Sequence, residues 1–258
     1  MWEKGGAALF LRDIQFRWER ISQSQKRQYP FQLPAYRSLD TLELHQPVTF
    51  FVGENGTGKS TLLEAIASLC DFPKSGGEIL AEEHSEAHEL LLDQVLRLSW
   101  MPRVRSGFFL RSETFFNFAS LLDRRKQEKD FGGNPYSRYG GKSLHQRSHG
   151  EAFLDLFQNR FQESGNSIYL LDEPEAALSP MRQLAFLSIM KKLVDTKRTQ
   201  FIICTHSPIL LGYPGADIYS FDEAPLQKID YEETPHYAVT KYFLNQRDAM
   251  LEKLFEEA

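Results

Sequence analysis

A short glycine-rich segment carries the clearest chemistry in this sequence. It reads Gly53-Glu54-Asn55-Gly56-Thr57-Gly58-Lys59-Ser60 and fits the pattern G-x-x-x-x-G-K-[ST] of a phosphate-binding loop. The apolar residues 48–52 before it predict a buried strand, and residues 61–67 after it predict the start of a helix. A glycine loop between a strand and a helix lets backbone N–H groups and the helix dipole meet phosphates. The segment therefore predicts a nucleotide site, the alternative being a glycine loop that binds nothing.

The residues of this loop are expected to have separate roles. Lys59 should reach the β- and γ-phosphates of ATP and stabilise the charge that develops during hydrolysis. The hydroxyl of Ser60 should bind Mg²⁺. The residues expected to contact ATP form one continuous set: Asn55, Gly56, Thr57, Gly58, Lys59, Ser60 and Thr61.

Two adjacent carboxylates follow a second apolar run. Residues 167–171 predict another buried strand, and Asp172 and Glu173 come directly after it. Asp172 is expected to hold Mg²⁺, directly or through water, and Glu173 to polarise the attacking water. The alternative is a solvated helix start, which Pro174 would also fit.

Two further segments add candidate site residues. The apolar residues 201–205 predict a third strand, and His206 at its end is expected to contact or sense the γ-phosphate, unless it is only a structural histidine. The segment Ser148-His149-Gly150-Glu151 precedes an amphipathic pattern and predicts a helix start with free N–H groups, a second anion site. Taken alone, this segment would be no more than a capped helix.

The order of these motifs resembles that of the ABC-type ATPases. Within that class the chain resembles the soluble branch of SMC-like repair heads and overcoming-lysogenization-defect nucleases. It looks closest to the small stand-alone bacterial ATPases of the AAA family, a likeness that covers nearly the whole chain and includes residues 109–111 and 231–234. Two departures stand out: residues 147–151 replace the Leu-Ser-Gly-Gly-Gln signature of transporter ATPases, and Ser179 replaces a usual Asp.

The resemblance implies a fold and an assembly. The fold would be an α/β P-loop NTPase with an ABC-ATPase-like core, meaning a mainly parallel sheet flanked by helices, a β-rich N-terminal lobe and an inserted helical subdomain. Ser148 and Gly150 would complete the ATP site of a second copy, so that ATP holds a homodimer together and hydrolysis releases it. Arg111 or Glu113 would sense the γ-phosphate and couple to the helical subdomain.

The motifs also suggest how the chain is organised. We expect a single ABC-type ATPase domain over 1–258, with core lobes at about 1–75 and 150–232 and a helical signature subdomain at about 76–161. Two short helices are expected over 234–257. Ser179 and Pro180 predict the start of a helix that runs to about residue 195.

Composition limits the remaining possibilities. The 258 residues are 41% hydrophobic and 25% charged, which is ordinary for a soluble protein, and the net charge of −5 gives no overall basic signature for nucleic acid. Cys70 and Cys204 lie in apolar settings and predict buried thiols in a reducing compartment. With no signal-peptide pattern and no run of about 18 apolar residues, we expect a cytoplasmic protein that does not insert into a membrane.

Three functions fit these observations. The first is an ATPase, converting ATP and water to ADP and phosphate, that drives or gates a partner, either a protein or a nucleic acid. The second is an ATP-dependent switch with negligible turnover, which Glu173 and His206 disfavour. The third is the ATP-binding subunit of a transporter, which the unusual signature disfavours. Tyr29, Phe31 and Tyr36 are candidates for stacking on adenine, although each also fits ordinary packing.

Overall fold

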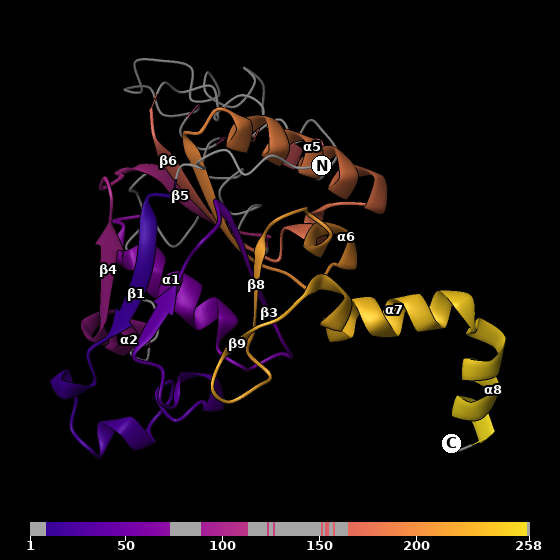
Figure 1. Ribbon diagram of the computed structural model, residues 1–258, viewed down its shortest axis with the longest axis horizontal. Helices are drawn as coiled ribbons and strands as arrows, with labels where there is room; N and C mark the ends of the chain where they lie inside the picture. The colour runs from indigo at the N-terminus through magenta and orange to yellow at the C-terminus, as the bar shows by residue number, and fades with distance from the viewer. Residues whose placement is uncertain are drawn as a thin grey trace.

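The structure is a computed structural model of the 258-residue chain (Figure 1). It describes residues 9–72, 89–112 and 165–256, together with residues 123, 126, 151, 153, 154 and 157. Ser148, Gly150 and Glu113 lie outside the described residues, so the expectations for the signature and for Glu113 stay predictions.

A six-stranded sheet forms the centre of the protein. Its strand order is β5-β6-β7-β3-β8-β9, with parallel pairing from β5 through β8 and one antiparallel edge strand, β9. The expected α/β fold with a mainly parallel sheet is therefore confirmed. The strands are β3 (Val48–Val52), β5 (Ser106–Arg111), β6 (Ser167–Asp172), β7 (Thr199–Cys204), β8 (Asp217–Ser220) and β9 (Gln227–Lys228).

A second, antiparallel sheet gives the N-terminal part of the chain its β-rich character. It has the order β2-β1-β4 and consists of β1 (Leu11–Phe16), β2 (Thr41–Glu43) and β4 (Leu96–Trp100). β4 and β5 both fall inside the span expected for the helical subdomain. They pair instead with β1 and β6, so this part of the span belongs to the two sheets of the core.

Helices cover both faces of the six-stranded sheet (Figure 1). Phe51 of β3 packs into a core shared with α1 (Lys59–Leu69), α2 (Glu89–Val95) and β1. Its neighbours Phe50 and Val52 face the opposite core, which contains residues of α5 (Pro180–Asp195) and α6 (Pro208–Leu211). A strand that is buried on both faces requires a continuous apolar run, and this explains the sequence of β3.

The C-terminal segment forms a helical arm that extends from the core of the protein. It consists of α7 (Pro235–Asn245) and α8 (Arg247–Glu256), which project away from the sheet (Figure 1). The two short helices expected here are confirmed, as is the start of α5 at Pro180 after Ser179. Short 3₁₀ helices complete the described elements: Trp18–Arg20, Gln25–Arg27, Pro34–Tyr36, Pro174–Ala177 and Tyr231–Glu233. Among the described residues, no helix combines the length and apolar character needed to cross a bilayer.

The two cysteines are buried free thiols, as expected. Burial raises the pKa of Cys70 to about 12 and raises that of Cys204 well above its ordinary value. Neither thiol therefore ionises readily at neutral pH, which fits packing residues rather than nucleophiles.

Candidate active site

The candidate site lies where four parallel strands end. The glycine loop follows β3, Arg111 is the last residue of β5, Asp172 is the last residue of β6, and His206 comes two residues after β7. Register brings Arg111 opposite Asp172 and Asp172 opposite Cys204. The carboxyl ends of parallel strands share one edge of a sheet, which is where α/β proteins bind ligands.

The glycine loop adopts backbone angles that other residues rarely take. Gly56 and Gly58 have φ angles of 80° and 104°. A Cβ on Gly58 would lie 2.8 Å from both Leu33 Cδ1 and Tyr36 Oη, whereas a Cβ on Gly56 would meet nothing within 4 Å. The Tyr36 hydroxyl also donates a 2.6 Å hydrogen bond to the carbonyl of Gly58. The loop is thus packed against Leu33 and Tyr36 at Gly58, whereas the space beside the Cα of Gly56 is empty.

Lys59 is the first residue of α1 and lies almost completely buried under the loop. Its Nζ donates hydrogen bonds to the carbonyls of Gly53, at 2.6 Å, and Glu54, at 2.8 Å. In the described part of the chain, α1 has no side-chain cap at Gly58. The first N–H groups of a helix have no partner within the helix, so this end of α1 offers uncapped donors beside a buried cation. That arrangement fits the phosphates of a nucleotide.

A carboxylate outside the recognised motifs also binds the backbone of the glycine loop. Asp222, just after β8, accepts a 2.7 Å hydrogen bond from the backbone N–H of Glu54 through its Oδ1. Thr57 Oγ1 donates to the carbonyl of the same Glu54 at 2.9 Å. The loop is therefore held at Glu54 by Asp222 and at Gly58 by Tyr36.

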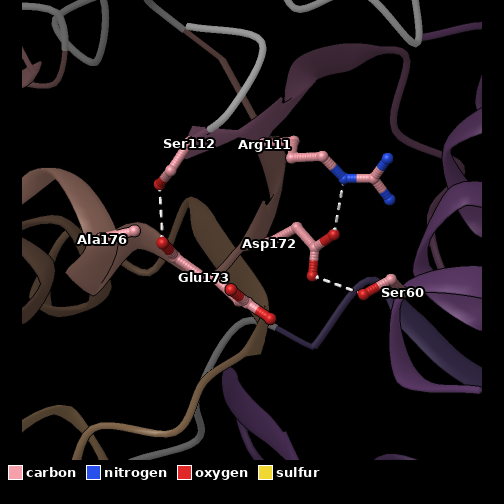
Figure 2. A pocket seen from close by; sticks show the side chains of 6 residues that line it. All are labelled: Ser60, Arg111, Ser112, Asp172, Glu173 and Ala176. Carbon is pink, nitrogen blue, oxygen red and sulfur yellow. Dashed lines mark hydrogen bonds and ion pairs between the residues drawn. The ribbon is translucent and has the colours of Figure 1, made fainter. Parts of the chain in front are cut away.

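A pocket of about 280 Å³ opens beside the loop (Figure 2). Ser60 Oγ donates a 2.9 Å hydrogen bond to Asp172 Oδ1. Arg111 Nε donates to the other oxygen, Oδ2, at 2.8 Å, and Nη2 pairs with Glu64. The pocket lining consists of Ser60, Arg111, Ser112, Asp172, Glu173 and Ala176.

The donor set of this pocket fits Mg²⁺. A hydroxyl and a carboxylate, from Ser60 and Asp172, meet at hydrogen-bonding distance on its wall. Mg²⁺ takes oxygen ligands and is held by few protein groups together with phosphates and waters. Both residues were predicted as Mg²⁺ ligands from the sequence.

Glu173 occupies an unusual backbone conformation. Its φ and ψ angles of 49° and 52° are left-handed, which is uncommon for a residue other than glycine. Its N–H donates to the Cys204 carbonyl at 2.9 Å. Its carbonyl accepts a 2.6 Å hydrogen bond from Ser112 Oγ (Figure 2). Strained residues of this kind persist where their surroundings hold them, and they gather at functional sites. The Glu173 side chain remains 43% exposed, so its carboxylate is accessible to water.

His206 faces Glu173 across the site. Its Nε2 lies 3.6 Å from Glu173 Oε1, and its backbone N–H donates to Glu175 Oε1 at 2.6 Å. Its Nδ1 lies 2.8 Å from Nε2 of His236, a residue of α7. Burial, followed by the charge of Lys59, lowers the pKa of His206, while burial raises the pKa of Glu175.

The structure thus brings together the predicted residues that it describes. The ATP-contacting set from Asn55 to Thr61 forms the loop and the first turn of α1, and Asp172, Glu173 and His206 lie at the same edge of the sheet. Glu151, the last residue of the predicted signature, forms a 3.2 Å ion pair with Arg182 of α5.

Sequence reasoning missed Asp222 and His236, because neither belongs to a motif and both lie far along the chain from the loop. Arg111 was predicted, as an alternative to Glu113, to sense the γ-phosphate, and the structure adds its ion pairs with Asp172 and Glu64. Of the adenine candidates, Phe31 and Tyr36 are buried core residues. Tyr29 is 40% exposed and hydrogen-bonds to Thr61 Oγ1 at 2.7 Å, next to the loop.

Comparisons with known proteins agree with this geometry. Residues 151–211 match the AAA ATPase domain family (AAA_15), and residues 31–106 match a second AAA domain family (AAA_23). The chain is 23% identical over 182 residues to the "Petrobactin import ATP-binding protein FpuD" of Bacillus anthracis, covering 65% of this chain and 66% of that protein. The alignment thus spans just under two thirds of the relative.

Several solved structures resemble this chain at low sequence identity. The SMC head domain from Thermotoga maritima is 17% identical, with a TM-score of 0.42 over 74% of this chain and 93% of that one. The cbiO1 protein of Clostridium perfringens, part of the ABC transporter complex cbiONQ, is also 17% identical, with a TM-score of 0.44 over 83% and 90%. Likenesses at this level assign no residue roles.

A glycine loop with a buried lysine, a serine–aspartate pair and an adjacent glutamate defines a P-loop nucleoside triphosphatase. The matches to two AAA domain families, over residues 31–106 and 151–211, agree with a P-loop ATPase domain.

Proposed function

We propose that this ATPase acts with Mg²⁺ as an ATP-dependent homodimer, and that its cycle drives or gates a partner. One observation supports the assignment of the chemistry above all: Ser60, Asp172 and Glu173 line a single pocket at the N-terminus of α1. These three side chains are the metal-binding and water-activating groups that phosphoryl transfer to water requires.

Each residue of the proposed site has a task that its contacts support. Lys59, held by the carbonyls of the loop, compensates the charge of the β- and γ-phosphates. Ser60 and Asp172 hold Mg²⁺, which when bound neutralises phosphate charge. Glu173 orients the attacking water and accepts its proton. His206 points its Nε2 toward Glu173 and contacts the γ-phosphate.

The exposure of two site residues supports the proposed dimer. The side chain of Glu173 is 43% exposed and that of His206 is 28% exposed, so both are partly accessible from outside the protomer. We infer that Ser148 and Gly150 of one protomer complete the site of the other, as the resemblance to ABC-type ATPases implies. The signature subdomain then consists of the inserted residues between β5 and β6, with the two sheets as the core lobes.

The partner is the least constrained part of the proposal. The helices α7 and α8 expose large apolar side chains: Val239, Tyr242, Leu244, Leu254 and Phe255. Exposed apolar side chains of this kind favour a protein partner over nucleic acid. We place the protein in the cytoplasm.

The similarity to a petrobactin import ATP-binding protein supports a second candidate function, the ATP-binding subunit of a transporter. Purification of the ATP-bound form from membrane and soluble fractions distinguishes the two.

The proposed chemistry and assembly are tested together with Glu173→Gln. This change keeps the size of the side chain but removes the carboxylate, so turnover should fall by about 10²-fold or more. ATP binding should survive, and light scattering should show an ATP-bound dimer. Glu232→Gln, at an exposed carboxylate of the 3₁₀ helix before α7, is the matched control and should behave as wild type. A fully active, strictly monomeric Glu173→Gln protein would refute both proposals.

The trans arrangement has its own test. Ser148→Arg and Lys59→Ala should each abolish hydrolysis from opposite sides of a shared site. Mixing the two inactive proteins should restore up to about a quarter of the wild-type rate, since about half of the dimers are mixed and each holds one intact site. A wild-type rate per chain that stays constant down to concentrations where only monomer exists would show that one chain holds a complete site.

A further inference from the structure

Two histidines from distant parts of the chain share a hydrogen bond beside the candidate site. Nδ1 of His206 and Nε2 of His236 are 2.8 Å apart, and the two rings meet edge to face with centroids 4.9 Å apart. His206 follows β7, whereas His236 is the second residue of α7. Helix α7 therefore contacts a histidine that faces Glu173.

The position of His236 is fixed by the start of α7. Thr234, the buried N-cap of α7, donates through Oγ1 to the carbonyl of Tyr231 at 2.8 Å and accepts from the N–H of Tyr237 at 3.4 Å. The Tyr231 hydroxyl in turn donates to the carbonyl of Pro208, the first residue of α6, at 2.9 Å. The turn that carries His236 is thus fastened to the turn that follows His206.

The number of ring N–H groups limits how His206 and His236 can hydrogen-bond to each other. A neutral imidazole carries one N–H, so the Nδ1···Nε2 contact is made either by an N–H of His206 or by an N–H of His236. The other nitrogen of His206, Nε2, lies 3.6 Å from a carboxylate oxygen of Glu173. A carboxylate can only accept hydrogen bonds, so this neighbour favours a hydrogen on Nε2 of His206. His206 Nδ1 then has a free lone pair, and His236 must donate its Nε2–H.

The surroundings favour two neutral rings. Burial is the first cause that lowers the pKa of each histidine, and each also faces a cation: Lys59 for His206, and a protonated His206 for His236. Carboxylates on the loop, β6 and the segment after β8 raise the pKa and so oppose this effect: Glu54, Asp172 and Asp222. Glu173 and Glu175 also face His206. The hydrogen-bonded pair keeps its contact as long as it carries no more than one extra proton.

We propose that His236 is a positioning residue that holds His206 in the Nε2–H tautomer, so that this N–H points at Glu173 and the γ-phosphate. The consequence for catalysis rests on the role proposed above for His206, whereas the tautomer itself does not. Groups that orient a functional histidine through its second nitrogen set both its tautomer and its ring direction. Through His236, the arm of α7 and α8 is linked directly to the catalytic edge of the sheet.

The tautomer can be observed without any turnover. In ¹⁵N-labelled protein at pH 7.5, long-range ¹H–¹⁵N correlation of imidazoles reports which ring nitrogen carries hydrogen. We expect His206 to be the Nε2–H form in wild type, and to shift toward the Nδ1–H form in His236→Phe, which has no donor. His236→Gln, whose amide can donate from the position of Nε2, should restore the wild-type pattern. His45→Gln, at an exposed histidine, is the control.

Turnover then tests the consequence. His236→Phe should lower kcat by about 10- to 100-fold with little change in KM for ATP, and His236→Gln should recover most of the loss. An Nδ1–H form of His206 in wild type, or an unchanged tautomer in His236→Phe, would overturn the positioning role. Wild-type turnover in His206→Ala would instead refute the proposed role of His206 and, with it, the catalytic consequence. If His236→Phe fails to fold, His236→Leu, which also lacks a donor, takes its place in both measurements.

Discussion

Arg111 offers a quantitative test of the architecture beside the loop. It spans two nearly buried carboxylates, Asp172 and Glu64, whose side chains are 4% and 7% exposed, and is itself 27% exposed. Removing one partner of a buried ion pair leaves an uncompensated charge and costs about 3–5 kcal/mol. Since Arg111 is partly solvated, we expect the lower value, about 3 kcal/mol, for Arg111→Met. Arg111→Lys keeps the charge but not the two-sided geometry of the guanidinium, so its loss should be smaller.

The assay is equilibrium unfolding in urea, followed by circular dichroism. At a slope of about 3 kcal/mol per molar urea, the Arg111→Met midpoint should fall by about 1 M. Arg182→Met is a matched control because Arg182 is exposed to a similar extent, 32%, but its carboxylate partner Glu151 is 58% exposed rather than nearly buried. Exposed pairs contribute about 0–1 kcal/mol, so its midpoint should hardly move. Equal losses in the two variants would refute the inference that Arg111 compensates a buried acidic cluster.

Two further predictions concern stability. Gly58→Ala should destabilise the fold by about 2 kcal/mol more than Gly56→Ala, because both have positive φ but only at Gly58 would the Cβ collide with neighbours. Similar urea midpoints would contradict this. Because burial lowers the pKa of His206 and His236 from an ordinary 6.5, the unfolded chain binds protons there that the folded chain does not. The free energy of unfolding should therefore fall as pH drops below about 6.5, and less steeply in His236→Gln; an identical pH slope in that variant would refute the linkage.

The strands and helices that the sequence predicted best are those with complete local signals. β3 and β6 are mainly apolar and fully buried runs; β3 leads into the glycine loop and β6 ends in Asp172. α5 begins at the Ser179-Pro180 pair, which is typical of a helix start. Position at a strand end was also enough to bring Asp172 and His206 to one edge, since parallel strands share their carboxyl ends.

Features that depend on pairing across the chain could not be predicted in this way. The partners of β4 and β5 are set by long-range register, so their place in the two sheets was missed. Arg111 meets Asp172 because β5 aligns with β6, and His236 meets His206 because the turn before α7 packs on α6. No local pattern encodes either contact.

The most direct test of the central claim, that ATP is bound and hydrolysed at the loop after β3, is Lys59→Ala. Phosphate release and calorimetric titration with ATP should be measured for this variant and for Lys191→Ala, which removes an exposed lysine paired with Asp195. Loss of a positioned charge at the phosphates should lower turnover or ATP affinity by about 10²-fold or more, whereas the control should match wild type. Both proteins should unfold cooperatively. Unchanged affinity together with unchanged turnover in Lys59→Ala would contradict the assignment of the site.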